Sequence, residues 1–290
     1  MNPRTYLYVP ADQEDKLLKA GGTRVDALIL DLEDAVAPDR KDTARSNLRT
    51  WFERTTDRSA HELWVRVDAG SVEEDLAVLP GHGRVGVVLP KAEPETLHRL
   101  DDLLGRWEEG AAVPRGSVRV LALLETAPGM ASVDQVARAP RVHRLGLGEA
   151  DLAADLGLVP GPERDEFAPL RMSVVLASAV ARLPAPIGPV ETAVRDVERL
   201  REGTRKLLRQ GFRARTLLSP RQIPVVEEVF TPSEEEVRRA EAVLSALEGE
   251  GTGATTDERG GFVDEAVARA AREVLLRTGA GGQQDGVRAD

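Results

Sequence analysis

Short apolar runs alternate with longer stretches of helical spacing through the first 230 residues of the chain. TYLYVP (5–10) and ALILDLEDA (27–35) are typical of buried strands, whereas 12–21 and 40–52 carry apolar residues at helical intervals. The remaining predicted strands cover 62–68, 85–91, 118–126, Ala185–Gly188 and 213–220, and residues 143–152 begin as the sixth strand. The remaining predicted helices cover Glu73–Leu79, Glu95–Glu109, Ser132–Ala139, Leu170–Arg182, Glu191–Gln210 and Ile223–Phe230.

Eight strand–helix units in this order predict an α/β protein with a (β/α)8 TIM barrel rather than an open sheet. The seventh strand is the weakest part of the pattern, because Pro184, Pro186 and Pro189 interrupt it and proline cannot donate to a sheet. We therefore expect a single barrel domain over residues 1–248.

The segment after the barrel has a different character. Ser233–Leu247 has the spacing of an acidic amphipathic helix, and the Gly- and Thr-rich residues 249–261 are typical of a flexible linker or mobile lid. A further helix is predicted from residue 262, so we interpret 262–278 as a C-terminal helical lid. Residues 279–290 are predicted to be a disordered tail.

Composition narrows the possible functions. Aromatic residues make up only 3% of the 290 residues, so the core must consist mainly of Leu, Val, Ala and Ile. The formal net charge of −10 argues against a nucleic-acid partner, which would need a basic face. The chain has no cysteine, which excludes disulfides, thiolate metal sites and cysteine nucleophiles. With no apolar leader pattern in residues 1–15 and no membrane-length apolar run, we expect a cytoplasmic protein without a membrane partner.

Charged side chains follow the predicted strands, where barrels place their catalytic groups. Glu125 ends the fifth strand and Asp151 follows the sixth, so adjacent strands supply two carboxylates. With water and substrate oxygens these could bind Mg²⁺ or Mn²⁺, which would chelate a 2-oxo acid or enolate. The alternative is that each carboxylate caps a helix or pairs with an arginine.

Basic residues at the same rim allow both a substrate-binding and a structural interpretation. Arg66 could bind a carboxylate through two hydrogen bonds, or it could form an ion pair with the acidic LDLEDA segment, which contains Asp31, Glu33 and Asp34. Lys91 could form a Schiff base with a carbonyl substrate, but an ion pair with Glu33 or Glu125 is the preferred interpretation. None of the four histidines ends a predicted strand, which argues against a zinc site.

Several motifs occur together in one order: RTYLYVP, LDLEDAVAPDRKDTAR, LWVRVD, VLPKAE, LLETAPG, LGLGEADLAADLG and SPRQI. Over residues 4–247 the chain resembles the HpcH/HpaI aldolase and citrate lyase β-subunit superfamily, in its CoA-thioester branch. This resemblance implies a barrel that assembles as a homotrimer or hexamer. It also implies reversible cleavage of a malyl-, citramalyl- or citryl-type CoA thioester into a 2-oxo acid and an acyl-CoA, and some relatives also hydrolyse the thioester.

The resemblance also implies roles for individual residues. Glu125 and Asp151 would bind Mg²⁺, Arg66 would bind the substrate, and Glu33 and Asp34 would support them. A C-terminal segment from a neighbouring subunit would cover the site and bring Asp264 as acid/base. Basic residues near the first strands would contact the CoA phosphates: Arg4, Lys41 and Arg45.

The chain departs from the family pattern at several positions. Asp68 stands where relatives usually have Asn, Glu149 where a small residue is common, Ile187 where Asp is frequent, and Ser219 where many have His. Two extra carboxylates are expected to make the site more negative. The departures leave open a CoA-independent aldolase acting on a free 2-oxo or hydroxy acid. A non-catalytic acyl-binding barrel is a third hypothesis, which retention of the predicted site residues disfavours.

Overall fold

The computed structural model describes residues 2–55, 61–82, 84–250, 254–256 and 261–278. The chain divides into two compact units. One unit is Pro3–Glu227, and the other combines the first two residues with Glu228–Asp290. The second unit therefore begins before residue 248, where the sequence had suggested the end of the barrel domain.

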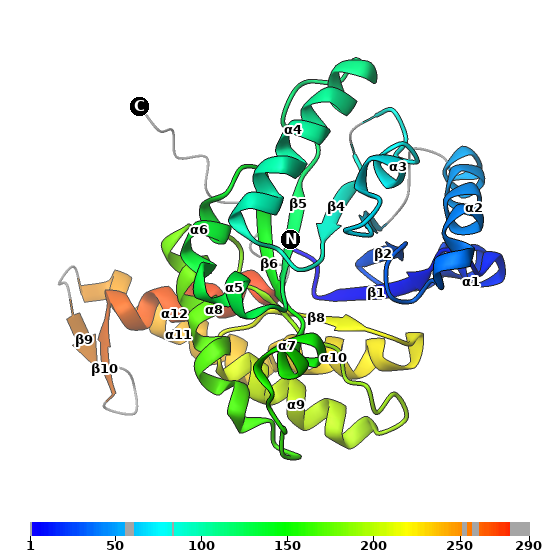
Figure 1. The fold of residues 1–290 in the computed structure, drawn as a ribbon. Coiled ribbons are helices and arrows are strands. Elements are labelled where there is room, and N and C mark those ends of the chain that lie inside the picture. The colour runs from blue at the N-terminus through cyan, green and yellow to red at the C-terminus, as the bar shows by residue number, and fades with distance from the viewer. Residues whose placement is uncertain (1, 56–60, 83, 251–253, 257–260, 279–290) are drawn as a thin grey trace. The chain divides into compact units, whose positions relative to one another are not determined.

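The first unit is a closed barrel of eight parallel strands in sequence order, which confirms the predicted (β/α)8 fold. Figure 1 shows β1, in blue, beside β8, in yellow, where the barrel closes. The strands are β1 (Thr5–Pro10), β2 (Ala27–Asp31), β3 (Glu62–Arg66), β4 (Gly86–Leu89), β5 (Val120–Leu124), β6 (Val142–Leu147), β7 (Ile187–Gly188) and β8 (Ala214–Leu217).

Helices connect successive strands of the barrel. They are α1 (Glu14–Ala20), α2 (Lys41–Arg54), α3 (Val72–Leu76), α4 (Pro94–Gly110), α5 (Ala127–Ala131), α6 (Val133–Arg138), α7 (Glu149–Leu156), α8 (Ala168–Val180), α9 (Val197–Arg209) and α10 (Ile223–Phe230). Short 3₁₀ turns precede three of them: η1 (Pro38–Arg40), η2 (Asp165–Phe167) and η3 (Pro220–Gln222).

The elements around the sixth and seventh strands differ most from the sequence prediction. Residues 143–152 begin as a strand, as predicted, and β6 ends at Leu147 before α7 begins at Glu149. The predicted helix 191–210 begins only at Val197, where the Asp196 side chain accepts a hydrogen bond from the Arg199 N–H and caps it. The seventh strand is indeed short, with two residues.

Alternate residues of the strands fill the barrel interior. Buried side chains there form one cluster: Tyr6, Ala27, Ile29, Trp64, Val88, Leu121, Leu123, Ile187 and Ala214. Trp64 is fully buried and occupies the place where a side chain on Gly86 of the neighbouring strand would lie. The interior is therefore a packed core, and the room for a ligand lies above it, at the carboxyl ends of the strands.

The second unit contains two helices and a hairpin. α11 (Glu234–Glu250) packs with α12 (Glu265–Thr278), and β9 (Ala254–Thr256) pairs antiparallel with β10 (Phe262–Asp264). The predicted linker thus contains a strand, and the predicted last helix starts three residues later than expected. The first two residues of that linker belong to α11, and its residues 251–253 and 257–260, like the predicted disordered tail, lie outside the described residues. No helix within the described part of the chain is long and apolar enough to span a membrane.

The contact between Gly86 and Trp64 predicts a large effect of one methyl group. In Gly86→Ala the new Cβ would overlap the Trp64 ring, whose Cη2 would lie only 2.9 Å away. We expect the free energy of unfolding to fall by about 1–3 kcal/mol, the usual cost of overpacking a core, as measured by urea denaturation. Gly81→Ala is the matched control, since a Cβ there meets nothing within 4 Å. An equal effect of the two substitutions would contradict this packing argument.

Candidate active site

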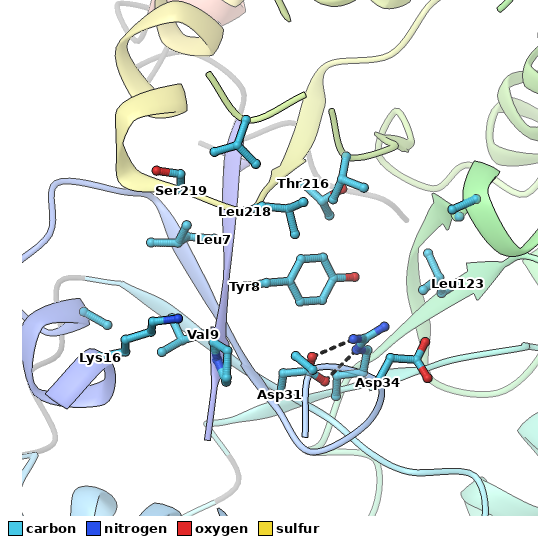
Figure 2. A pocket seen from close by; sticks show the side chains of 18 of the residues that line it. Leu7, Tyr8, Val9, Lys16, Asp31, Asp34, Leu123, Thr216, Leu218 and Ser219 are labelled. Atoms are coloured by element: carbon cyan, nitrogen blue, oxygen red, sulfur yellow. Dashed lines mark hydrogen bonds and ion pairs between the residues drawn. The ribbon is translucent and has the colours of Figure 1, made fainter. Parts of the chain in front are cut away.

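A cavity of about 630 Å³ opens at the carboxyl ends of the barrel strands. Its apolar lining includes Tyr8, Leu123 and Leu218, and Figure 2 shows the Tyr8 ring among these side chains with Asp31 and Asp34 to one side. Further polar side chains come from four elements or the loops that follow them, namely Arg66, Glu125, Asp151 and Ser219. The carboxyl-end rim thus combines an apolar wall with converging charged groups, the usual composition of a ligand site.

Arg66 is held at the cavity by a buried ion-pair network. Its Nε and Nη2 donate to the two Asp31 oxygens at 2.7 and 2.6 Å, and its Nη1 lies 2.7 Å from Glu33 Oε2. Asp31 and Arg66 are direct neighbours in the β2–β3 register. The guanidinium also lies over the Tyr8 ring, 4.8 Å from its centroid. This contact fixes the plane of the guanidinium.

The ion pairs leave Arg66 able to bind a ligand. Burial lowers the pKa of Arg66, but the hydrogen bonds and charge of Asp31 outweigh this and raise it above its ordinary value, so the side chain stays cationic. A guanidinium has five N–H donors, and Asp31 and Glu33 occupy three of them. The two others, one on each terminal nitrogen, remain for a substrate oxygen. The structural and substrate-binding interpretations of Arg66 are therefore compatible.

Glu33 bridges Arg66 and Lys91. Its Oε1 lies 2.9 Å from Lys91 Nζ, and only 5% of the residue is exposed. Burial lowers the pKa of Lys91, but the hydrogen bond to Glu33 and the charges of Glu33 and Glu125 raise it above its ordinary value. A Schiff-base lysine needs the opposite shift, since its neutral amine is the nucleophile. The geometry favours the ion-pair role of Lys91.

Glu125 and Asp151 line the same cavity without a basic partner. Glu125 is 3% exposed, and its Oε1 accepts a 2.8 Å hydrogen bond from the Lys91 main-chain N–H. Burial, together with the charges of Glu33 and Asp151, raises the pKa of Glu125 to about 8. Within the described residues, neither Glu125 nor Asp151 has an arginine or lysine within ion-pair distance.

Gly148 makes room for the Glu125 carboxylate. A Cβ at Gly148 would overlap Glu125 Oε2 and lie 2.8 Å from the Glu125 Cβ. The residue just before α7 must therefore be glycine for Glu125 to lie this close to the end of β6. Gly148 directly follows β6 and precedes α7. The glycine therefore lies where the strand ends and also leaves room for the Glu125 carboxylate.

Asp68 and Glu149 were expected to make the site more negative, but basic side chains neutralise both carboxylates. Asp68 lies 2.7 Å from Lys41 Nζ. Glu149 is 1% exposed and points to Arg164 and Arg171, at 2.7 and 2.6 Å. That expectation was wrong because the partners come from other elements of the fold. The other two residues that depart from the family pattern are Ile187 and Ser219. Ile187 belongs to the barrel core, whereas Ser219 lines the cavity and caps η3.

The residues predicted to contact CoA phosphates are not brought together at the cavity. Arg4 precedes β1 at the amino end of the barrel, where its main-chain N–H donates to Asp26. Arg45 is buried and bonded to Asp75, Ser71 and Asp42. Lys41 lies at the correct end but pairs with Asp68 and donates to the Leu32 and Glu33 carbonyls.

Other residues at the cavity were missed by the sequence argument. Lys16 and Lys19 of α1 line its mouth, one helical turn apart. Tyr8 lies under the Arg66 guanidinium, whereas Asp31, which pairs with Arg66, was among the partners expected from the sequence. The alternation of TYLYVP places Tyr8 on the same side as the core residue Tyr6, which was a usable signal. No local signal indicated the two lysines.

Asp264 lies in the second unit, at the end of β10. Its Oδ1 accepts hydrogen bonds from the main-chain N–H groups of Ala266 and Val267, at 2.9 and 3.0 Å, so it caps α12. Its Oδ2 makes no hydrogen bond to any residue that the structure describes. A structural role for one oxygen therefore leaves the other available.

The chemistry of this rim fits a divalent cation. Asp31 and Glu33 are paired with Arg66 and Lys91, whereas Glu125 and Asp151 line the cavity with no basic partner within ion-pair distance among the described residues. No group of three or more His, Asp or Glu side chains within the described ranges could hold a metal by itself. Water and substrate would have to complete the coordination, as is usual for Mg²⁺. Fold and site together define a (β/α)8 barrel with a cation-accepting cavity at its carboxyl-end rim.

Comparison with known proteins is consistent with that class. The family model for HpcH/HpaI aldolase/citrate lyase matches residues 4–220, and the chain belongs to this family. It is 30% identical over 280 residues to the citrate lyase subunit beta of Leuconostoc mesenteroides subsp. cremoris, covering 94% of this chain and 92% of that protein. It is 33% identical over 248 residues to a (3S)-malyl-CoA thioesterase of Cereibacter sphaeroides, covering 84% and 83%.

A solved structure resembles the whole chain. It is that of protein CitE from Mycobacterium tuberculosis in complex with magnesium, acetoacetate and coenzyme A. The TM-score is 0.78 at 32% identity, with 96% of this chain and 98% of that chain covered. The family prediction made from the motifs is confirmed.

The raised pKa of Glu125 predicts how the metal-free protein responds to pH. In the folded state the carboxyl keeps its proton up to about pH 8, compared with about 4.5 when unfolded. The stability that this proton contributes is complete below pH 4.5 and is lost as the pH rises towards 8, by up to about 1.4 kcal/mol per pH unit. Denaturant unfolding of the metal-free protein is measured in chelator at pH 6 and at pH 8.5. Between these two pH values the free energy of unfolding of wild type should fall relative to that of Glu125→Gln. Parallel pH profiles would contradict the assignment.

Proposed function

We propose that this protein is a Mg²⁺-dependent carbon–carbon lyase that cleaves, or forms, a malyl-, citramalyl- or citryl-type CoA thioester. The products of cleavage would be a 2-oxo acid and an acyl-CoA. The observation that carries this proposal is the pair Glu125 and Asp151, two carboxylates without basic partners that line one cavity. The named activities and ligands of the relatives support it.

The chain's own residues would orient the substrate. A bound Mg²⁺ would supply Lewis-acid stabilisation of the negative charge that develops on substrate oxygens. Arg66 donates its two remaining N–H groups to the carboxylate or carbonyl end of the substrate, and Asp31 and Glu33 hold the guanidinium in place. Protonated Lys91 balances the charge of Glu33 and adds positive potential at the rim. Asp34 lines the cavity and can hold water.

The mouth of the cavity suits an acyl-CoA. Lys16 and Lys19 are exposed at the mouth and can approach phosphate groups, while Val190, Val194 and Leu218 offer apolar lining to the acyl chain. Of the basic residues first considered for this contact, Lys41 lies nearest to the rim, but Asp68 already neutralises it. We therefore assign the phosphate contacts to Lys16 and to Lys19, whose ion pair with Asp15 is exposed to solvent, ahead of Arg4, Lys41 and Arg45.

The proposal includes a neighbouring subunit. Asp264, from the C-terminal unit of a second copy in a homotrimer or hexamer, would protonate the thioester enolate through its unbonded oxygen. The cytoplasm is the compartment that we propose for this reaction.

Calorimetric titration separates the hypotheses. Mg²⁺ is titrated in the presence of pyruvate, glyoxylate or oxaloacetate, with and without acetyl-CoA or propionyl-CoA. We expect oxo-acid binding that requires Mg²⁺ and is strengthened by a CoA thioester. Binding of oxo acid without any CoA effect would favour the CoA-independent aldolase. No metal-dependent binding would contradict the lyase and favour a non-catalytic barrel.

Glu125→Gln should remove Mg²⁺-dependent binding in that titration and abolish turnover, because an amide oxygen carries no charge for the cation. The amide keeps the shape of the carboxylate and can still accept from the Lys91 N–H, so circular dichroism and the gel-filtration volume should match wild type. Glu198→Gln, on the exposed face of α9, is the control and should bind Mg²⁺ normally. Full activity of Glu125→Gln would refute the metal assignment.

Asp264→Asn tests the acid/base role without removing the helix cap. Asn caps helices about as well as Asp, so α12 should remain folded. We expect turnover to fall by about 10²–10⁴-fold, the usual contribution of general acid–base catalysis, while Mg²⁺ and oxo-acid binding stay unchanged. A variant truncated before Gly251 should show at least the same loss. Unchanged kcat in both variants would exclude the lid.

A further inference from the structure

A second cavity, of about 240 Å³, lies on the outside of the barrel wall. It is lined by residues from the α7–α8 connection, α8, the loop after β7, α9 and β8. In β8 the side chains of Ala214 and Thr216 belong to the interior, so Arg215 between them faces outward into this cavity. The cavity is thus separated from the barrel interior by the strand itself.

The inner wall of the cavity carries buried charge. Glu149, Arg171, Glu191 and Arg215 are each at most 4% exposed. Arg171 Nε donates to Glu149 at 2.6 Å, but the nearest carboxylate to Arg215 is Glu191 at 3.8 Å. Arg215 otherwise donates to carbonyl and hydroxyl oxygens, which carry no net charge. Burial lowers the pKa of Arg215 to about 10, as expected for a cation with too little compensating charge.

Partly exposed basic residues surround the mouth. Arg164 donates to Glu149 through Nε only, and its backbone is left-handed, with φ of 52°. A non-glycine residue in that conformation is strained and is retained where its side chain must point in one direction. Arg199 lies 3.3 Å from Glu191, and Lys206 pairs with Asp165.

The charges around the cavity do not balance. Glu149 is shared by Arg164 and Arg171, and Glu191 is shared by Arg199 and Arg215, so four guanidinium groups meet two carboxylates. Two other acidic lining residues, Glu198 and Glu202, pair with Arg201 and Arg205 on the exposed face of α9. Glu163 also lines the cavity, and its carboxylate offsets one of the remaining positive charges. An excess of one positive charge remains inside a protein whose formal net charge is −10.

We infer that this cavity is a second binding site, which takes a phosphate group. An anion would offset the excess charge beside the buried Arg215, and its oxygens can accept from guanidinium groups on several sides. The volume lies below the range of about 300–1,000 Å³ for drug-sized ligands, which fits inorganic phosphate or a small phosphate monoester. The site is independent of the proposed lyase activity, although Glu149 and Asp151 lie in the same turn of α7.

Calorimetry at constant ionic strength tests the site with two probes, inorganic phosphate and glycerol phosphate. We expect saturable one-site binding of at least one probe, and the tighter probe identifies free or esterified phosphate as the occupant. Arg199→Gln and Lys206→Gln should each weaken it about tenfold, the loss of one charge-assisted hydrogen bond. Arg209→Gln removes the same charge from the same helix at an exposed position outside the cavity lining, so it should bind as wild type does.

Lys16→Gln reports whether the probe binds at the active-site mouth instead. The inference stands if the Lys16 variant binds phosphate normally while the Arg199 and Lys206 variants do not. It is overturned if neither probe binds wild type, if Arg209→Gln loses as much affinity as the Arg199 variant, or if Lys16→Gln alone abolishes binding. Circular dichroism of the Arg199 and Lys206 variants excludes unfolding as the cause of any loss.

Discussion

The Arg66–Asp31 ion pair is the interaction on which the active-site rim depends. It joins β2 and β3 at directly opposed positions, is almost fully buried, and uses both Asp31 oxygens. Removing one member of such a pair typically costs about 3–5 kcal/mol, because the other is left charged and unpaired. From this pair the network continues through Glu33 to Lys91, whose main-chain N–H reaches Glu125. The orientation of four side chains therefore follows from one strand pairing.

The barrel could be predicted because its signal is local. Buried parallel strands are apolar runs, and each is followed by a helical period, so their order could be obtained without knowledge of any contact. Glu125 and Asp151 could be predicted for the same reason, since their place in the chain alone assigns them to the rim. The hairpin of β9 and β10 was missed because three-residue strands in a Gly- and Thr-rich stretch have too few residues to show alternation.

The charge state of the site could not be predicted, because it depends on partners from distant elements. Asp68 is neutralised by Lys41 and Glu149 by Arg171, pairs separated by 27 and 22 residues that no pattern in the sequence connects. The roles of Gly86 and Gly148 were hidden for a related reason. A sequence shows that glycine is present, but the side chain that fills the vacated space comes from a neighbouring strand.

Charge balance distinguishes the two cavities more sharply than their shape does. In the first cavity Glu125 and Asp151 have no basic partner within ion-pair distance among the described residues, so this cavity favours a cation. In the second, four guanidinium groups pair with two carboxylates, so it favours an anion. Glu149 separates these regions: its backbone begins the helix that carries Asp151, and its carboxylate points away to Arg164 and Arg171. Had that carboxylate turned inward, it would have added negative charge beside Asp151 and left two buried arginines unpaired. Its orientation is therefore a condition for both sites.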